Sequence, residues 1–219
     1  MKSSPRPPAP RERPDLPLAW ESAPLGALAP HGGEIRLDEC HLQDAAWLNG
    51  KAGALRLEGC VLRHVRFTGS EFGSVVWKDV RLIGCDLANC KAHRMSLLRV
   101  EMEDCRLSGL SSPAADWRDV LVANSDARFA QLPGGACRRC EFTGTDLQEA
   151  DLRGADLSGA LLRACRLGRA DLREARLQET DLRHSDLEDM LVGLADLNGA
   201  IVDAPQAMVL ARLMGIQIH

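Results

Sequence analysis

The sequence predicts an all-β solenoid, a chain that coils around a narrow row of inward-pointing side chains. Three observations lead to this fold class. Large apolar residues recur every five positions, the five-residue frame runs without a slip from residue 37 to residue 202, and a column of small residues lies two positions before the large ones. Repetition at one fixed period is typical of a repeat architecture, in which each unit packs on its neighbours.

An interval of five residues fits neither of the regular backbone structures. The stretch DLQEADLRGADLSGALL places leucines at positions 147, 152, 157 and 162. In an α-helix a step of five residues rotates the side chain by about 500°, or about 140° net, so these leucines would not share a face. In a straight strand an odd interval sends alternate side chains to opposite faces. The chain must therefore bend once in every five residues.

The five-residue frame is long and nearly free of exceptions. It contains (202 − 37)/5 + 1 = 34 central positions, and Ser112 is the one polar residue among them. The column two positions before each centre holds small or medium side chains, many of them Cys, Ala, Ser or Thr, and the residue between the two columns is often Asp. We expect two side chains of every five to point into the core and three to point outward.

Several units match a known repeat. ADLRG (150–154), ADLSG (155–159), ADLRE (170–174) and ADLNG (195–199) resemble the consensus A(D/N)LXX of the pentapeptide-repeat family. This resemblance implies a right-handed quadrilateral β-helix with four pentapeptides per coil. The 34 units would then form about 8 coils (34/4 = 8.5) over residues 34–204. At roughly 4.8 Å per stacked strand, the rod would be about 41 Å long.

The N-terminal 33 residues lie outside the frame and hold eight of the eleven prolines. We expect residues 1–33 to form a flexible Pro-rich arm, partly in polyproline II conformation, whose later part caps the first coil. A cap is needed because an uncovered coil exposes strand edges and core leucines. A partner-recognition motif is the other interpretation of the arm. The apolar residues available for the cap are Leu16, Leu18, Trp20, Leu25 and Leu28.

The C-terminal segment, residues 205–219, changes period and predicts a short α-helix followed by a strand. Pro205 suits the first turn of this helix and Gly215 its C-terminal cap. The stretch QAMVLARLMGIQI leaves almost no polar face and resembles the C-terminal module of the quinolone-resistance pentapeptide proteins. That resemblance implies a two-fold symmetric homodimer joined end to end, with a monomeric cap as the alternative. The expected dimer residues are Met208, Val209, Leu210, Leu213, Met214, Ile216 and Ile218.

The residues suited to chemistry do not form a catalytic or metal-binding pattern. All eight cysteines fall in the two inward columns, where a free thiol serves as a small apolar side chain. Cys137 and Cys140 form a C-x-x-C, but no second pair or nearby His completes a zinc set. The six histidines are scattered, and no nucleophile-elbow, Walker or zinc-protease motif is present. We therefore expect no enzymatic activity, no metal and no cofactor.

The charge and hydropathy of the chain bear on its compartment and partners. A net charge of −4 argues against direct nucleic-acid binding through a basic surface. We expect no signal peptide, and no apolar run in the sequence approaches the roughly 18 residues of a membrane span. Free cysteines suit a reducing environment. We expect a cytoplasmic protein that does not bind a membrane.

Charge is unevenly distributed along the predicted rod. Residues 34–140 carry 14 acids and 15 bases, a net of +1, and residues 141–204 carry 14 acids and 7 bases, a net of −7. Four units per coil would place residues 20 apart on the same side. One side of the acidic half would then carry residues 145–149, 165–169 and 185–189. The acids expected to project there, interrupted by Arg166 and Arg169, are Asp146, Glu149, Asp186, Glu188 and Asp189.

Two functions fit such a surface. The first is a protein-binding scaffold with an unidentified partner, in which the exposed acids serve mainly solubility. The second, implied by the family resemblance, is a DNA mimic that occupies the DNA-binding saddle of DNA gyrase or of another type II topoisomerase, such as topoisomerase IV. Electrostatic complementarity would drive the second kind of binding. Binding that weakens steeply with salt would favour the mimic.

Overall fold

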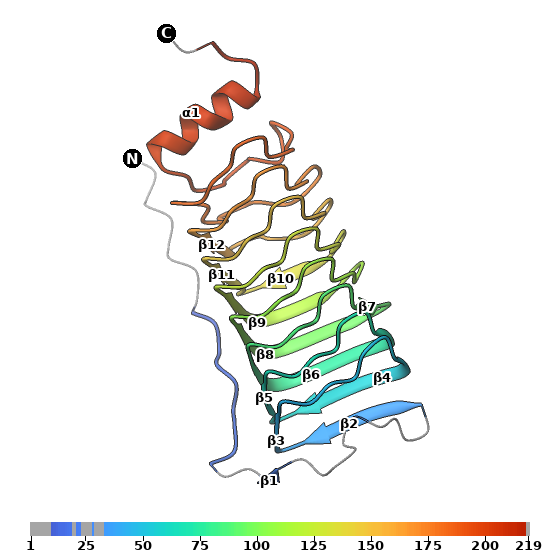
Figure 1. The fold of residues 1–219 in the computed structure, drawn as a ribbon. Helices are drawn as coiled ribbons and strands as arrows, with labels where there is room; N and C mark the ends of the chain where they lie inside the picture. The colour runs from blue at the N-terminus through green and yellow to red at the C-terminus, as the bar shows by residue number, and fades with distance from the viewer. Residues whose placement is uncertain (1–9, 19–20, 23–27, 29–32, 218–219) are drawn as a thin grey trace.

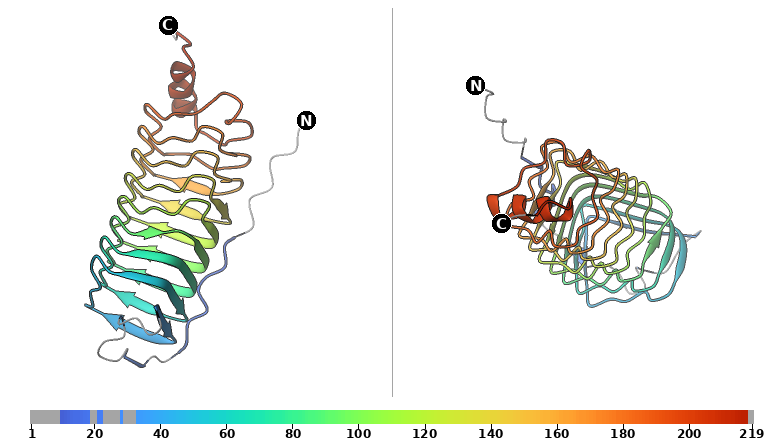
Figure 2. Two further views of the ribbon diagram at one scale, coloured as in Figure 1. Left: turned by 90° about the vertical axis from the view of Figure 1, so that its right-hand side faces the viewer. Right: turned by 90° about the horizontal axis from the view of Figure 1, so that it is seen from above.

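The computed structural model describes residues 10–18, 21–22, 28 and 33–217. Within these residues the chain forms a rod of stacked parallel coils, and an α-helix lies across its C-terminal end (Figures 1 and 2). The all-β solenoid predicted from the sequence is confirmed.

The strands of the described residues belong to one twelve-stranded parallel sheet that wraps around the rod. They are β1 (Glu21–Ser22), β2 (Glu34–Asp38), β3 (Cys40–Gln43), β4 (Lys51–Glu58), β5 (Val61–Arg63), β6 (Glu71–Ile83), β7 (Lys91–Ala92), β8 (Met95–Glu103), β9 (Asp116–Ala123), β10 (Ala136–Arg138), β11 (Glu141–Thr143) and β12 (Leu161–Arg163). The helix is α1 (Ala204–Leu213). The main path through the sheet is β1-β3-β5-β6-β8-β9-β11-β12.

Each coil takes twenty residues. Partners across the sheet differ by 20, from Glu34 opposite Ala54 to Asp181 opposite Ile201. Residues 34–201 therefore span (201 − 34 + 1)/20, or about 8.4, coils. The stretch with a twenty-residue partner on both sides, residues 54–181, makes about 6 turns. The predicted count of about 8 coils thus combines about 6 internal turns with the partly paired coils at the two ends.

The chain bends at every fifth residue, as the sequence interval requires. At most corners the residue two positions after the centre has a positive φ, such as 56° at Asp79, 57° at Glu149 and 64° at Gly154. A left-handed residue closes a tight bend, and Gly, Asn and Asp adopt it at the lowest energetic cost. Four bends in twenty residues produce the four-sided section seen along the rod axis (Figure 2).

The two inward columns form the core. The central side chains Leu57, Leu157 and Leu172 are at most 1% exposed, and Ala150 of the small column is fully buried. Burial of each leucine contributes roughly 1.5–3 kcal/mol of transfer free energy. Ser112, the polar centre, is also buried, and its Oγ has no hydrogen-bond partner among the described residues. The two predicted inward columns are confirmed, although some outward positions, among them Glu101 and Asp119, are also buried.

Polar residues in the small column each make the same type of hydrogen bond. The donors Cys60 Sγ, Thr145 Oγ1 and Ser185 Oγ reach a main-chain carbonyl at 3.3, 3.0 and 2.7 Å. In each case the acceptor belongs to a central residue 23 positions earlier, in the preceding coil. A thiol and a hydroxyl are therefore interchangeable here, because both are small and both can donate to this carbonyl. This position accounts for most of the cysteines.

The N-terminal arm is docked on the rod where the structure describes it. Residues 10–18 run along one side, from the middle of the rod toward the first coils (Figure 2). The N–H of Glu12 donates to Asp119 Oδ1 at 3.0 Å, and the N–H of Asp15 donates to Asp79 Oδ1 at 2.8 Å. The expectation of a flexible arm is wrong for these residues, because their N–H groups meet carboxylates on the rod.

The predicted N-terminal cap is met in part. Leu28 is 7% exposed and joins the core of the first coils. Leu16 is half-buried, and Leu18 is fully exposed. Trp20 and Leu25 lie outside the described residues. Within the described part of the arm, Leu28 and strand β1, which pairs with β3, therefore cover the first coil.

Helix α1 closes the C-terminal end. Asp203 and Gln206 form a capping box at its start, with Pro205 in the first turn. Gln206 is buried, and its Nε2 donates to the carbonyls of Leu182 at 2.6 Å and Ser185 at 2.7 Å. These carbonyls belong to the last coils, which no further coil covers. The helix therefore satisfies an open sheet edge.

The segment after α1 differs from the expectation. Gly215 adopts φ +79°, as a helix cap requires. Ile216 and Gln217 follow without joining a strand, and Ile218 lies outside the described residues. The predicted C-terminal strand is thus not formed within the described residues. Among these residues, no helix is long and apolar enough to cross a membrane.

Candidate functional site

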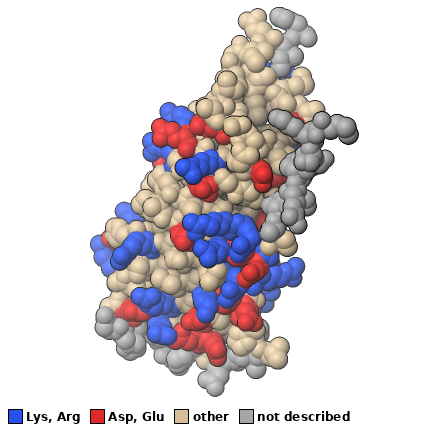
Figure 3. All heavy atoms as spheres, turned by 180° about the vertical axis from the view of Figure 1, so that it is seen from behind, with Lys and Arg blue, Asp and Glu red and all other residues tan. Residues whose placement is uncertain are grey.

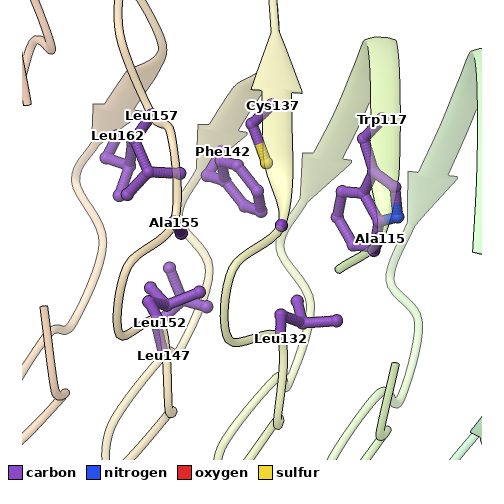
Figure 4. Close-up of a pocket in the computed structure, with 11 residues that line it drawn as sticks. Ala115, Trp117, Leu132, Cys137, Phe142, Leu147, Leu152, Ala155, Leu157 and Leu162 are labelled. Carbon is purple, nitrogen blue, oxygen red and sulfur yellow. The ribbon is translucent and has the colours of Figure 1, made fainter. Parts of the chain in front are cut away.

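The interior of the rod leaves no room for a substrate. The opening inside it has a volume of about 20 Å³, and its walls include Trp117, Cys137, Phe142 and Leu157 (Figure 4). This is space for about one water-sized sphere. None of the lining side chains carries a carboxylate, imidazole, amine or hydroxyl group. Any function of the described residues must therefore lie on the outer surface.

The cysteines are placed as packing residues. Burial raises the pKa of the Cys90 thiol to about 12 and the pKa of the Cys165 thiol to about 11. Both thiols stay protonated at neutral pH, where only a thiolate would act as a nucleophile. Cys137 is half-buried and Cys140 is buried. In the described part of the chain, no three His, Cys, Asp or Glu side chains are grouped closely enough to hold a metal ion.

The Asp that precedes many central residues forms a local clamp. Asp151 Oδ1 accepts the N–H of Arg153 at 3.1 Å and its Nε at 2.9 Å, and Asp151 Oδ2 accepts Nη2 at 2.7 Å. The same three hydrogen bonds recur between Asp171 and Arg173. The carboxylate holds the turn in the manner of an Asx turn, and the arginine neutralises it. Much of the acidic sequence is thus structural and compensated.

The arginine partner also lowers the pKa of these carboxylates. The side chain of Arg153 holds the pKa of Asp151 below its ordinary value, and Arg173 does the same for the pKa of Asp171. Asp181 has two such partners, Arg183 and Arg163, which place its pKa well below the ordinary value. Each carboxylate is therefore more favourable as an ion in the folded chain than in the unfolded chain.

The five acids predicted to form one face are not equivalent. Asp146 is buried and pairs with Arg166 at 2.6 Å, and Glu149 lies 3.8 Å from Arg169. Asp186, Glu188 and Asp189 are exposed, and the described residues offer them no ion-pair partner within 4.0 Å. The side chains of these last three residues make the uncompensated acidic patch, which lies in the last full coil.

Elsewhere on the rod the two signs of charge alternate. On the face drawn in Figure 3, basic and acidic side chains lie side by side over the first and middle coils, whereas the C-terminal end shows few of them. Lys78 pairs with Glu58 at 2.6 Å and Lys51 with Glu71 at 3.0 Å, each across one coil step. Exposed pairs of this kind contribute little stability, roughly 0–1 kcal/mol each. They leave the N-terminal half close to neutral.

One corner of the rod carries a more buried ladder of charges. Arg99 forms a bidentate pair with Asp79, with both distances 2.6 Å, and Arg139 Nε lies 2.6 Å from Asp119. The neighbouring Glu101 is 3% exposed and accepts Arg81 Nη2 at 2.7 Å. We call this surface the corner groove. It consists of Asp79, Arg99, Glu101, Asp119, Arg139 and Glu141.

Sequence reasoning missed the corner groove, although a signal for it was present. Asp, Arg, Asp and Arg alternate at positions 79, 99, 119 and 139, at the interval of one coil. Glu101 and the arm residue Arg11 have no comparable signal, because nothing in the pattern places residue 11 beside residue 101. The role of Gln206 at the open sheet edge was missed for the same reason.

Helix α1 has a buried face and an exposed face. Of the residues predicted to form a dimer interface, Leu210 is buried, and Val209 and Met214 are half-buried. Met208, Leu213 and Ile216 are 46%, 39% and 56% exposed. Ile218 lies outside the described residues. The structure thus brings part of the predicted set into the cap and leaves three large apolar side chains on the surface.

The exposed face of α1 continues onto the last coil. Leu191 and Leu194 are 46% and 75% exposed, because the coil around them is irregular. A cleft of about 700 Å³ lies between α1 and this coil, with Arg169, Arg173, Asp189, Met190, Leu191, Val192 and Leu213 on its walls. Apolar side chains and charges meet here without a converging set of catalytic groups.

The comparisons with known proteins concern the repeats. Residues 123–163 and 150–189 match the family described as pentapeptide repeats, with eight copies. No curated protein matches the chain.

Solved structures of three other proteins are also similar. A trypsin-treated variant of QnrB1, a plasmid-mediated fluoroquinolone resistance protein, is 20% identical over 82% of this chain and 99% of its own, with a TM-score of 0.37. A pentapeptide repeat protein of the Arabidopsis thaliana thylakoid lumen is 27% identical over 41% of this chain and 66% of its own, with a TM-score of 0.33. HetL of the cyanobacterium Nostoc, involved in heterocyst differentiation regulation, is 19% identical over 81% of this chain and 90% of its own, with a TM-score of 0.28.

We predict that the Asp–Arg clamps make the rod sensitive to acid. Because the folded pKa values of Asp151, Asp171 and Asp181 are lowered, their contribution to stability is complete above the unfolded pKa of about 3.9 and is lost as the pH falls from there through the lower folded pKa. Asp181→Asn should lower the free energy of unfolding by roughly 1–2 kcal/mol at pH 7 and by less at pH 3, where the unfolded carboxyl is mostly protonated. Urea unfolding at the two pH values measures this difference, with Glu179→Gln as an exposed control. An equal loss at both pH values would contradict the assignment.

Proposed function

Since residues 123–189 match the family described as pentapeptide repeats, we propose that this chain is a non-enzymatic scaffold that binds another protein and acts as an end-to-end homodimer. The proposal places it in the cytoplasm, without a cofactor, a membrane or directly bound nucleic acid.

The position of the exposed apolar side chains carries this proposal. The described residues contain eight exposed large apolar side chains, and five of them, Leu191, Leu194, Met208, Leu213 and Ile216, belong to residues 191–216. A cluster of this kind at one end of a protein is typical of an interaction surface. The cleft beside it adds a concave apolar region. No comparable cluster occurs on the sides of the rod among the described residues.

The absence of enzymatic activity in this proposal rests on the surface chemistry. Catalysis needs polar groups that converge on one reacting atom in a partly enclosed site. In the described residues the carboxylates are spread along the corners and sides, mostly in clamps with arginine. Flat sides with regular side-chain ladders suit contact with another protein surface better.

The scaffold proposal is tested by capture from an extract of the source cells. Purified, immobilised protein should retain one or a few proteins in stoichiometric amounts, and they should remain bound at 0.5 M salt if apolar contacts dominate. Heat-unfolded protein serves as the control for non-specific adhesion. Recovery of chaperones alone, or of the same proteins by the unfolded control, would count against a scaffold.

The dimer proposal is tested at the exposed face of α1. Leu213→Asp should convert a wild-type dimer into a monomer, weakening association about 100-fold or more, because it places a charge in a dry apolar joint. Sedimentation velocity at micromolar protein measures the change. Leu48→Asp is the matched control, since Leu48 is 47% exposed near the other end of the rod. A wild-type monomer, or equal effects of the two substitutions on association, would refute the end-to-end dimer.

A second function, the topoisomerase-binding DNA mimic, is favoured by one observation. Asp186, Glu188 and Asp189 are exposed, and the described residues place no base within ion-pair distance of them. In an end-to-end dimer the two patches would flank the joint and produce a negative middle. The compensation of Asp146 and Glu149 by Arg166 and Arg169 weighs against this function. It therefore ranks below the scaffold.

A supercoiling assay with DNA gyrase tests the mimic. The protein should inhibit gyrase, or protect it from a fluoroquinolone, and the effect should fall steeply between 50 and 200 mM salt. Asp186→Lys with Glu188→Lys and Asp189→Lys should abolish it. Glu39→Lys with Asp44→Lys and Asp104→Lys makes the same charge change in earlier coils and should not. No effect at micromolar protein, or equal effects of the two triple variants, would exclude this function.

A further inference from the structure

The corner groove holds its carboxylates in a fixed arrangement. Arg99 and Arg139 bind Asp79 and Asp119 through two nitrogens each, so each carboxylate keeps its orientation. Asp79 and Asp119 are 40 residues apart, which is two coils. Their separation along the rod is therefore about 9.6 Å. One oxygen of each accepts a main-chain N–H from the arm.

This spacing matches an extended peptide rather than a helix or a strand. In polyproline II conformation three residues advance about 9.3 Å, and the same face returns every third residue. The two N–H donors belong to Glu12 and Asp15, which are three residues apart. Pro10, Pro14 and Pro17 favour this conformation in the arm. The two carboxylates, two coils apart, are thus spaced to accept two main-chain N–H groups that lie three residues apart in an extended peptide.

The groove also recognises one basic side chain. Arg11 Nη2 lies 2.9 Å from Glu101 Oε1, and Arg11 Nε lies 3.5 Å from Glu141 Oε2. The Arg11 side chain is 9% exposed and the Glu101 side chain 4% exposed. A buried, charge-assisted pair of this kind is worth more than the exposed pairs on the rod sides. An arginine one residue before the first N–H donor is therefore part of the recognised pattern.

The chain's own arm fills this groove incompletely. Arg11 Nη1 is buried and has no hydrogen-bond partner among the described residues. A polar gap of about 270 Å³ remains where Leu16 and Pro17 face Glu39, Glu58 and Asp79. Lys78, which also lines the gap, pairs with Glu58, and Arg99 pairs with Asp79, so of these three carboxylates Glu39 is the one that has no ion-pair partner among the described residues. A segment with a longer basic side chain at that position would fit better.

We propose that the corner groove is a binding site for extended, proline-containing, basic peptide segments of another protein, and that residues 10–17 occupy it as an intramolecular competitor. The inference rests on the proposed scaffold function and names one surface and the chemistry of its ligand. The ligand presents an arginine, main-chain N–H groups three residues apart, and a lysine or arginine at the place of Leu16. Binding of the partner segment displaces the arm.

The test uses the full-length protein with the arm released. Glu12→Pro with Asp15→Pro removes the two N–H donors and keeps the polyproline II conformation. Arg13→Pro is the matched control, because the N–H of Arg13 makes no hydrogen bond with the described residues. Arg11→Ala releases the arm by a second route, through loss of the Glu101 pair. Circular dichroism confirms that each variant keeps the rod.

The probe is a fluorescent peptide of residues 10–18, followed by anisotropy. It should bind the released variant at least ~10-fold more tightly than wild type or Arg13→Pro, because the tethered arm competes at high effective concentration. The peptide with Leu16→Lys should bind more tightly still, and Glu101→Gln in the released protein should weaken binding. Equal binding to released and wild-type protein, or to a scrambled peptide, would overturn the proposal. Capture of a partner despite that result would leave the scaffold function intact and refute only this site.

Discussion

Stacking of equivalent residues at a rise of about 4.8 Å governs the rest of this structure. Because partners differ by twenty residues, each side chain on the rod lies between the residue twenty earlier and the residue twenty later. Like charges in that arrangement would repel each other along the whole rod. Alternation of Asp79, Arg99, Asp119 and Arg139 turns the repulsion into a ladder of bidentate pairs. The same constraint selects small residues in one inward column and large ones in the other.

The part of the fold that depends on this local repetition was predictable from the sequence. The interval of five defined the bends and the inward columns, the family resemblance implied the coil of twenty residues, and the period change at Pro205 indicated α1. The contacts of the arm were not predictable. Arg11 and Glu101 are 90 residues apart, and Glu12 and Asp119 are 107 apart. A period carries no information about which rod residues a non-repeating segment will meet.

The candidate surfaces, like the fold, were predictable from the sequence only in part. The excess of acids in residues 141–204 could be counted from the sequence. The count does not show which of these acids are exposed and which are paired with arginine. Asp146 lies under Arg166, whereas Asp186, Glu188 and Asp189 are exposed, although Asp146 and Asp186 occupy equivalent positions two coils apart. Likewise, Leu210 and Leu213 of α1 are one turn apart, yet the first is buried in the cap and the second is open. No further coil stacks on the last coil of a solenoid, so which side chains are buried there depends on how the cap covers it.

The two-coil period of the corner groove limits how a gene for this rod can change length. Loss or duplication of one whole coil preserves every inward column, since twenty residues are four complete units. At this corner, however, removal of the single coil that carries Arg99 would place Asp79 directly against Asp119 and leave Asp79 without its arginine. It would also halve the spacing that the arm contacts require. The alternation of charges at this corner therefore accepts changes in length only in steps of forty residues, although the core alone would accept twenty.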